Sequence, residues 1–206
     1  INRGRAKLVV TDTDHAERIA AVAGQLRVER IAVLGDHACL PGALNFGELY
    51  APSAGEPDLG GMDYGDTSSV LWTSGTTGKS KGVMQSHNVW IRAAENANRH
   101  FGTAGGDIAY NCLPLYNSAA WVANIYRALA TGIPCGLDQQ FSVSKFWNRI
   151  RHYGATQTMT LVAMHMCLWN GPRRDDDADN PLRVASMVPM PQKLLGPFCE
   201  RFGMEG

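Results

Sequence analysis

A ten-residue stretch, Thr73–Gly82, combines glycine, hydroxyl and lysine residues at close spacing and reads T-S-G-T-T-G-K-S-K-G. Its glycines allow several backbone N–H groups to turn toward one point, and such a nest binds anions. The interleaved hydroxyls add hydrogen-bond donors, and Lys79 and Lys81 add positive charge. Phosphate is the ligand that this combination suits best, so the stretch predicts a phosphate-binding loop.

Two alternatives to this interpretation are weaker. The P-loop of nucleotide triphosphatases follows the pattern G-x-x-x-x-G-K-[ST], but Thr73 stands five residues before Gly78, where that pattern requires glycine. The residues after the loop, Gly82–Met84, also have an extended rather than a helical pattern. The other alternative is a loop of this composition that binds no ligand. It is disfavoured because ordering a glycine-rich loop costs conformational entropy, and no ligand contact would offset that cost.

The longer string Leu71–Val83 closely resembles the signature of the adenylate-forming superfamily, which includes acyl-CoA synthetases, luciferases and peptide-synthetase adenylation domains. The usual pattern has proline before the second lysine, where this chain has Ser80. The resemblance implies that the loop binds ATP, accompanied by Mg²⁺, with Lys81 and Thr76 as catalytic residues. The implied nucleotide-binding residues are Thr73, Ser74, Gly75, Thr76, Thr77, Gly78, Lys79 and Lys81.

A second segment, Leu113–Asn117, resembles the family's L-P-aromatic-H segment, which lines the acyl pocket. Asn117 occupies the histidine position, so the role of that imidazole in relatives does not carry over. The resemblance implies that Tyr116, Asn117 and Trp121 contact the acid substrate. The stretch Ala185–Pro191 stands where many relatives have Gly-Gly-Gly-Ala-Pro, and it matches that pattern poorly.

Three further segments resemble the carnitine/crotonobetaine-CoA ligase branch of the family. They are Phe141–Trp147, Tyr153–Thr156 and Phe198–Gly203. The substrate acid itself cannot be read from the chain, because side chains of the acyl pocket discriminate by only ~1–3 kcal/mol per methylene-sized change.

The resemblance extends over essentially all 206 residues and implies an acid-CoA ligase (AMP-forming). Such an enzyme uses ATP to convert a carboxylic acid to an acyl-adenylate and then transfers the acyl group to CoA as a thioester. We expect this chain to be a fragment of the large N-terminal domain, truncated at both ends and inactive alone. The alternative is a protein that binds nucleotide or acyl-adenylate without turnover, which the departures at Asn117 and Ser186–Pro191 favour.

Alternating apolar segments predict an α/β fold with parallel or mixed sheets flanked by helices. The predicted strands are 6–10, 31–34, 69–72, 83–85, 108–113, 133–137, 156–161 and 184–188. The predicted helices are 15–26, 88–101, 119–130, 142–153, 162–170 and 192–202, with Ser86 or His87 and Ser142 as N-caps. Residues 41–66 read as a surface loop.

By family resemblance, residues 1–105 belong to one partial αβ subdomain with the phosphate loop 73–82. Residues 106–206 belong to a second, with the acyl-pocket segment 113–121.

The amino-acid composition limits the classes of partner that the protein is expected to bind. Lysine plus arginine equal aspartate plus glutamate at 19 each, so no overall charge favours nucleic acid. No apolar stretch reaches the ~20 residues of a membrane span. The five cysteines are scattered without a C-x-x-C pair, so neither a zinc site nor a disulfide framework is indicated, and the pattern is typical of a cytoplasmic protein. The oligomeric state stays open.

Several other candidates have plain interpretations. The run Asp175–Asp179 predicts a solvated loop rather than a metal site. His87 is favoured as a helix-start residue over a nucleotide contact, and His165, within a Met-rich stretch, as a core histidine over a catalyst. Trp147 and Trp169 are expected to be packing residues.

Overall fold

The computed structural model describes residues 1–50, 55–56, 58–73 and 78–205. The chain divides into two compact units. The first unit comprises Ile1–Asp63 and Trp72–Val83, and the second comprises Tyr64–Leu71 and Met84–Gly206. Each unit is described by itself below.

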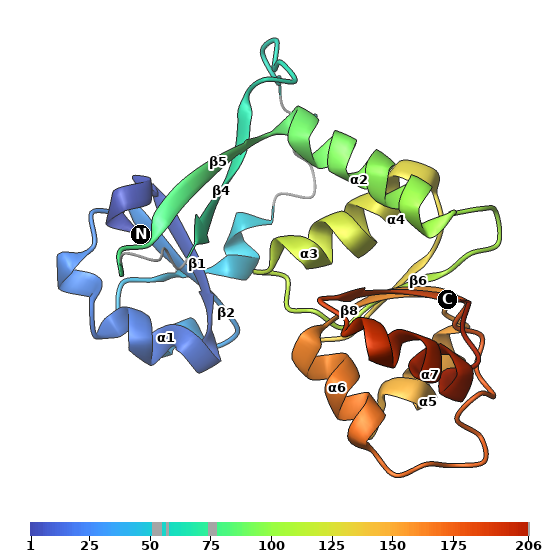
Figure 1. Cartoon of the computed structure of the whole chain (residues 1–206). Helices are drawn as coiled ribbons and strands as arrows, with labels where there is room; N and C mark the ends of the chain where they lie inside the picture. Colours follow the sequence, from blue (N-terminus) through green and yellow to red (C-terminus); the bar gives the residue numbers. More distant parts are fainter. Residues whose placement is uncertain (51–54, 57, 74–77, 206) are drawn as a thin grey trace. The chain divides into compact units, whose positions relative to one another are not determined.

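The first unit contains a three-stranded parallel sheet in the order β1-β2-β3 (Figure 1). Its strands are β1 (Leu8–Asp12), β2 (Arg30–Leu34) and β3 (Leu44–Asn45). The helix α1 (Thr13–Ala20) connects β1 to β2, which confirms the predicted βαβ unit. Asp12 caps α1 through its side chain, which accepts a hydrogen bond from the His15 N–H at 2.9 Å.

Two predictions for this unit are wrong in detail. The helix predicted over 15–26 ends at Ala20, and a separate 3₁₀ turn, η2 (Ala23–Gln25), follows it. Gly24 weakens helix in this stretch, and the Asn2 side chain instead donates to the Gln25 carbonyl at 2.7 Å. The segment read as a plain surface loop also contains β3 and the 3₁₀ turns η3 (His37–Cys39) and η4 (Phe46–Leu49). A further 3₁₀ turn, η1 (Asn2–Gly4), lies near the start of the chain.

The second unit is built on a four-stranded parallel sheet in the order β7-β6-β8-β9. Its strands are β6 (Ala109–Asn111), β7 (Cys135–Leu137), β8 (Gln157–Leu161) and β9 (Val184–Val188). Helices cover both faces of this sheet (Figure 1). One face carries α2 (His87–Phe101), α3 (Ser118–Ala120), η5 (Trp121–Ile125) and α4 (Tyr126–Thr131). The other carries α5 (Phe146–Tyr153), α6 (Val162–Asn170) and α7 (Gln192–Phe202). This arrangement confirms the predicted α/β class.

The core of the second unit lies between the sheet and the layer of α5, α6 and α7. Aromatic rings dominate it: Phe198 and Phe202 have ring centroids 4.7 Å apart, and Trp147 stacks on Phe202 at 4.4 Å. Phe146, Phe198 and Phe202 are each at most 2% exposed. Full burial of such a side chain stabilises the fold by about 1.5–3 kcal/mol, so this cluster anchors the helix layer on the sheet. Trp147 and Trp169 are packing residues, as predicted.

The helix predicted over 119–130 is interrupted. It starts as α3 after Asn117, passes through the π-helical turn η5 and continues as α4 to Thr131, where Gly132 adopts a φ of 73° and ends it. Single π-helical turns are rare and are found mostly at functional sites. The predicted Ser142 cap of α5 is wrong, because α5 begins at Phe146 and Lys145 occupies the N-cap without a side-chain hydrogen bond.

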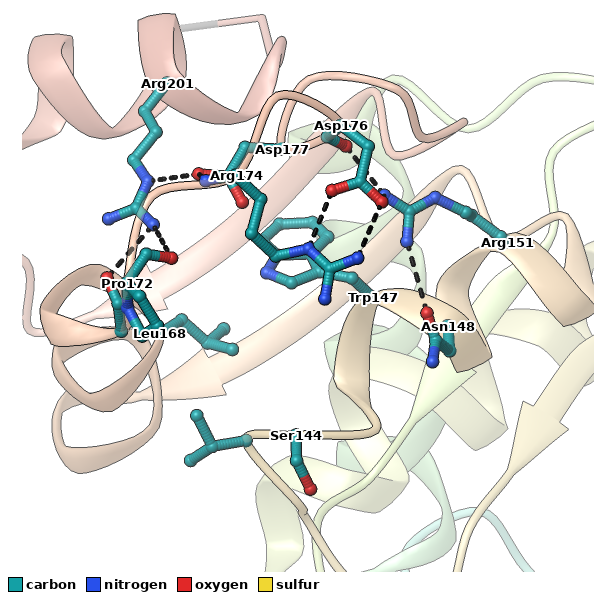
Figure 2. Close-up of a pocket in the computed structure, with 12 residues that line it drawn as sticks. Ser144, Trp147, Asn148, Arg151, Leu168, Pro172, Arg174, Asp176, Asp177 and Arg201 are labelled. Carbon is teal, nitrogen blue, oxygen red and sulfur yellow. Dashed lines mark hydrogen bonds and ion pairs between the residues drawn. The ribbon is translucent and has the colours of Figure 1, made fainter.

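The acidic run is a loop, as predicted, but it is not fully solvated. Asp177 is 7% exposed and accepts a hydrogen bond from Nε of Arg201 at 2.7 Å (Figure 2). Asp176 contacts both Arg151 and Arg174. Within the described residues, no group of three or more His, Cys, Asp or Glu side chains could hold a metal ion.

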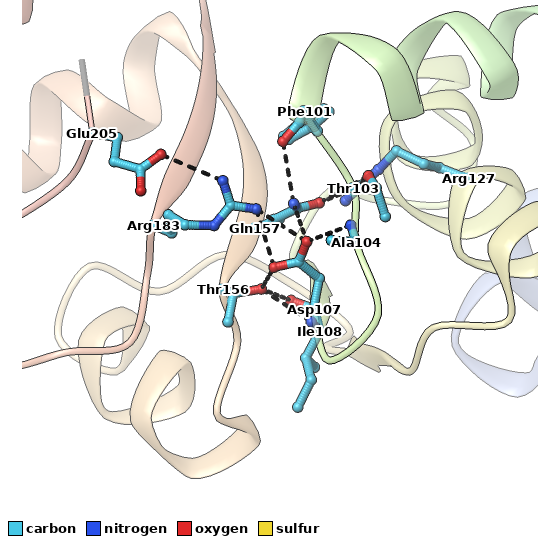
Figure 3. A network of polar contacts seen from close by, with 10 residues as sticks. All are labelled: Phe101, Thr103, Ala104, Asp107, Ile108, Arg127, Thr156, Gln157, Arg183 and Glu205. Atoms are coloured by element: carbon cyan, nitrogen blue, oxygen red, sulfur yellow. Dashed lines mark hydrogen bonds and ion pairs between the residues drawn. The ribbon is translucent and has the colours of Figure 1, made fainter.

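A buried polar network connects the amino ends of β8 and β9 to α2 and α4, on one face of the sheet (Figure 3). Asp107 accepts hydrogen bonds from the Gln157 side chain at 2.8 Å and from Arg183 at 3.0 and 3.1 Å. Gln157 also contacts Arg127 of α4, which is fully buried and lies 4.1 Å over the ring of Phe101. These contacts fix the amino ends of β8 and β9 relative to α4 and to the loop that follows α2.

The helix α2 packs against α4 and η5 within the second unit. Trp90 stacks on Tyr126 at 5.4 Å, and the Asn98 side chain donates to the Arg127 carbonyl at 3.2 Å. The subdomain boundary expected at residue 105 stays a prediction. Of the described helices, none is both long and apolar enough to cross a bilayer.

Candidate active site

The phosphate loop joins two paired strands, β4 (Thr67–Thr73) and β5 (Lys81–Ser86). Parallel pairing needs a crossover of a dozen or more residues, so a connection this short makes the pair antiparallel. Four residues of the predicted site, Ser74, Gly75, Thr76 and Thr77, lie outside the described residues. The remaining four, Thr73, Gly78, Lys79 and Lys81, are all exposed to solvent at the neck of the loop.

Local contacts close the neck. The Thr73 hydroxyl donates to the Lys81 carbonyl at 3.5 Å, which joins the last residue of β4 to the first of β5. Gly78 has a φ of +80°, a conformation that favours glycine over residues with a Cβ. The exit from the loop is the strand β5, as predicted, and not the helix that a nucleotide triphosphatase P-loop requires.

Arg3 adds a contact that sequence reasoning missed. Its Nη1 donates to the Ser80 carbonyl at 3.0 Å, and its guanidinium lies 5.5 Å from the ring centre of Trp72. Arg3 lies 77 residues from Ser80 along the chain, so no local pattern could have indicated the contact. Together with Lys79 and Lys81 it gives the loop neck three cationic side chains, which favours an anionic ligand.

The acyl-pocket segment begins where β6 ends, and Asn117 has a structural role there. Its side-chain Oδ1 accepts a hydrogen bond from the Ala119 N–H at 2.9 Å, which caps α3. Its own N–H donates to the Pro114 carbonyl at 2.9 Å. The asparagine in this position therefore starts a helix, a task for which histidine is poorly suited.

Tyr116 and Trp121 differ sharply in their surroundings. Tyr116 is 88% exposed, whereas the Trp121 indole N–H donates to the Leu115 carbonyl at 2.6 Å. Trp121 is also the first residue of η5, and its ring lies 6.0 Å from that of Tyr126. Trp121 thus fixes the backbone of the segment, while Tyr116 is free to meet a ligand.

A cavity of about 330 Å³ lies at the carboxyl ends of β6 and β7. Its lining residues are Asn111, Leu113, Leu115, Leu137, Asp138 and Gln139. In open parallel sheets, ligands bind outside the carboxyl ends of the strands, so this cavity has the position of a binding site. The acyl-pocket segment contributes Leu113 and Leu115 to its wall.

Polar groups that sequence reasoning did not single out lie in the wall of this cavity or contact it, and Asp138 and Asn111 are among its lining residues. Asp138 accepts a hydrogen bond from the Tyr110 hydroxyl at 2.5 Å and pairs with Arg149 at 2.6 Å. Burial, together with the hydrogen bond to Asp138, raises the pKa of Tyr110 far above its ordinary value. The side-chain amides of Asn111 and Asn124 contact each other at 3.0 Å inside the unit. The available signal in the sequence was a charged residue, Asp138, directly after a predicted strand.

Cys112, the partly buried Cys135 and His165 are unsuited to nucleophilic or acid–base chemistry. Burial raises the pKa of Cys112 to about 12 and that of Cys135 to about 11, so both stay as thiols near neutral pH. His165 is fully buried, and burial lowers its pKa. Its Nε2 donates to the Pro189 carbonyl at 3.0 Å and its Nδ1 contacts the Thr160 hydroxyl at 3.2 Å, which confirms it as a satisfied core histidine.

His87 is the first residue of α2 and Ser86 is its N-cap, as the sequence predicted. The Ser86 hydroxyl accepts a hydrogen bond from the Val89 N–H at 3.4 Å. The loop neck belongs to the first unit and the acyl-pocket segment to the second, and each is described within its own unit.

Comparisons with known proteins give a consistent result. A model of the family described as "AMP-binding enzyme" matches residues 1–205. The chain is 28% identical over 200 residues to a medium/long-chain-fatty-acid–CoA ligase of Mycobacterium tuberculosis, covering 97% of this chain and 33% of that protein. It is 31% identical over 201 residues to a steroid-22-oyl-CoA synthetase of Rhodococcus jostii, covering 97% of this chain and 35% of that protein.

Solved structures share the fold at lower identity. An anthranilate CoA ligase in complex with anthranoyl-AMP matches with a TM-score of 0.85 and 20% identity, over 98% of this chain and 40% of that one. A benzoate CoA ligase from Burkholderia xenovorans matches with a TM-score of 0.80 and 17% identity, over 99% of this chain and 40% of that one. The chain spans about a third of the length of the curated relatives it matches.

Proposed function

Because the chain belongs to the AMP-binding enzyme family, we propose that it supplies the phosphate loop and part of the acyl site of an acid-CoA ligase (AMP-forming). The reaction is ATP-dependent activation of a carboxylic acid to an acyl-adenylate, followed by transfer of the acyl group to CoA. The observation that carries the proposal is the glycine, hydroxyl and lysine loop set between two strands and leaving as a strand.

The chemistry explains why such a loop is needed. A carboxylate is a poor acyl donor because its leaving oxygen would be anionic, and adenylation replaces that oxygen with a good leaving group. The loop amides and the hydroxyls of Thr73, Ser74, Thr76 and Thr77 would hold the β- and γ-phosphates, with Lys81 as the charged partner. They would stabilise the negative charge that develops as pyrophosphate departs.

Mg²⁺ would arrive bound to the phosphates of ATP. Among the described residues, no group of three or more acidic, histidine or cysteine side chains could hold a metal ion. CoA is the proposed acceptor of the acyl group.

The acid would bind at the carboxyl ends of β6 and β7, where the 330 Å³ cavity has Leu113, Leu115 and Leu137 in its wall. Trp121 would keep this wall in place through Leu115, and the exposed Tyr116 would contact the acid directly. Asn117 would act as the helix cap of the segment. Relatives carry names that refer to fatty-acid, steroid and aromatic acids. The carnitine-like acids suggested by Phe141–Trp147 belong in the substrate panel beside them.

Nucleotide binding by this 206-residue chain is the first test. We expect calorimetry with MgATP to detect binding to the wild type and Lys81→Ala to weaken it about tenfold or more, the cost of a hydrogen bond to a charged group. Lys7→Ala, which removes an exposed lysine of the same unit, is the matched control and is expected to leave affinity unchanged. Equal affinity of Lys81→Ala and wild type would contradict the assignment of the loop.

Turnover is tested separately, by exchange of pyrophosphate into ATP in a longer polypeptide that contains this chain. Exchange that depends on one acid of a broad panel supports the ligase. Binding of MgATP without exchange for any acid would favour the alternative of a nucleotide or acyl-adenylate binder without turnover. We expect the 206 residues alone to form no thioester.

A further inference from the structure

A second, larger cavity lies in the helix layer of the second unit (Figure 2). Its volume is about 480 Å³, within the ~300–1,000 Å³ of small-molecule sites. It lies among α5, the end of α6, the acidic loop and α7. Its lining residues are Val143, Ser144, Trp147, Asn148, Arg151, Leu168, Gly171, Pro172, Arg174, Asp176, Asp177 and Arg201.

This cavity is distinct from the candidate active site. α6 starts directly after β8 and returns along it, so the end of α6 lies toward the amino ends of the strands. Leu168 and Gly171, at that end of α6, line the cavity. The acyl-pocket segment follows the opposite, carboxyl end of β6. No residue lines both the 480 Å³ and the 330 Å³ cavity among those described.

Two of its three arginines are committed to holding the wall. Arg201 donates from Nε to Asp177 and from its terminal nitrogens to the carbonyls of Trp169, Gly171 and Pro172, at 2.6–3.1 Å. Arg151 donates to the carbonyls of Asp179 and Asp176 at 2.6 and 2.7 Å. These contacts keep the acidic loop folded over the helices and the cavity open.

The third arginine is available. Arg174 has a side chain that is 67% exposed, and its described partners are the Asp176 carboxylate, at 2.8 and 3.1 Å, and no other side chain. Asp176 is itself 41% exposed. The pair is bidentate, but Asp176 also pairs with Arg151 at 3.4 Å, so Asp176 keeps a cationic partner when Arg174 turns to another anion. Its planar guanidinium suits a carboxylate in particular.

Most of the remaining wall is apolar, and Ser144 and Asn148 are its uncharged polar residues. Val143, Trp147, Leu168 and Pro172 line it. Trp147 is fixed in place by its stacking on Phe202 at 4.4 Å, so the wall is preformed. The cavity's three arginines and two aspartates leave one net positive charge beside this apolar surface.

We propose that this cavity is a binding site for a small amphipathic carboxylate, with its apolar body against Trp147 and Leu168 and its carboxylate on Arg174. One net positive charge matches one carboxylate. The site goes beyond the proposed ligase function, since no residue of the loop or of the acyl-pocket segment takes part in it.

Octanoate is a suitable probe, with 1-octanol as its uncharged counterpart. We expect titration of the ¹⁵N-labelled 206-residue chain with octanoate to shift the Trp147 indole N–H resonance, and 1-octanol to bind at least tenfold more weakly. Arg174→Ala should raise the octanoate Kd about tenfold, the loss of a charge-assisted hydrogen bond. Arg173→Ala removes the neighbouring arginine, which does not line the cavity, and should leave the Kd unchanged.

Ser144→Trp provides a variant that fills the cavity from an exposed position and leaves the buried arginine contacts intact. It should abolish the shift at Trp147. Shifts at the Leu115 and Tyr116 amides report the other cavity, so binding there alone would overturn this proposal without affecting the ligase proposal. Equal affinity for octanoate and 1-octanol, or an Arg174→Ala Kd equal to that of wild type, would also overturn it.

Discussion

At the scale of single residues, the partner of each polar side chain decides its role. Asn117 caps a helix, His165 is held neutral between a hydroxyl and a carbonyl, and Asp107 is the acceptor at the centre of a buried network. Burial by itself raises the pKa of Asp107, but hydrogen bonds from the Ala104 N–H, Thr156 and Arg183 outweigh it and hold the pKa below its ordinary value of 3.8. Asp107 is therefore an anion at neutral pH that the fold needs.

Replacing Asp107 tests this dependence on charge. A carboxyl group whose pKa is lowered by folding stabilises the native state above its unfolded pKa and loses that contribution as pH falls through the folded pKa. We expect Asp107→Asn to lower the free energy of unfolding by about 2 kcal/mol at pH 7, the scale of hydrogen bonds to a charged group. The difference from wild type should shrink below about pH 4. Urea unfolding at pH 7 and pH 3 measures both values.

Glu205→Gln is the matched control, because Glu205 is the other carboxylate partner of Arg183. Its side chain is 65% exposed and lies 3.4 Å from Arg183. An exposed pair contributes ~0–1 kcal/mol, so this variant should be close to wild type at both pH values. A constant Asp107→Asn deficit from pH 7 to pH 3 would refute the electrostatic role.

At the scale of elements, turns at strand ends position the candidate site. A turn follows β6, and a hydrogen bond from the Asn117 N–H to the Pro114 carbonyl closes it. The chain then continues directly through α3, η5 and α4. The cap at Asn117 and the Trp121 hydrogen bond to Leu115 together set the conformation of the acyl-pocket segment.

The cap predicts the order of three Asn117 variants. Asn117→Ala should lower the free energy of unfolding by about 1 kcal/mol, because the Ala119 N–H loses its acceptor. Asn117→Asp keeps an acceptor in the same place and should be close to wild type. Asn117→His, which introduces the residue of the family's L-P-aromatic-H segment that this stretch resembles, should be destabilised like the alanine variant. Denaturant unfolding measures all three, and a wild-type stability for Asn117→Ala would show that the cap is unimportant.

At the scale of the whole molecule, the two units differ in how much core they contain. Among the described residues of the first unit, the fully buried apolar side chains are Ala16, Ala32, Val33 and Leu40. Two of these are alanines, which bury little surface. The second unit has the large contiguous cluster around Tyr110, Phe146 and Phe202. Burial of apolar area dominates folding free energy, so the second unit should be the more stable.

Native-state hydrogen exchange tests the difference. Regions with few buried apolar contacts open with low free energies, whereas core strands exchange only on global unfolding. We expect the amides of β1 and β2 to exchange at least tenfold faster than those of β6 and β8. Mass spectrometry of peptic peptides after deuterium labelling measures the rates. Equal protection of both sheets would show that the two units open together.

Much of the fold followed from local pattern. The α/β class, the parallel pairing of β1 with β2, and the bounds of α6, α7 and β9 were all predicted, because apolar period and flanking turn residues act within a few positions. The predicted bounds were wrong where the local apolar pattern disagreed with residue propensities or with tertiary contacts. The first helix ends at Ala20, with Gly24 in the 3₁₀ turn that follows it, and β3 pairs with β2 in a stretch whose sequence predicted a loop.

The prediction of a phosphate-binding loop rests on the sequence alone, since glycine, hydroxyl and lysine at that spacing suit one kind of ligand. The side chains that surround the loop neck and the two cavities could be known only from the tertiary structure. Arg3 reaches the loop neck from 77 residues away, Asp138 meets Tyr110 from a different strand, and Arg151, Arg174 and Arg201 gather around one cavity. Contacts between distant parts of a chain depend on how the elements pack, and no spacing along the sequence encodes them.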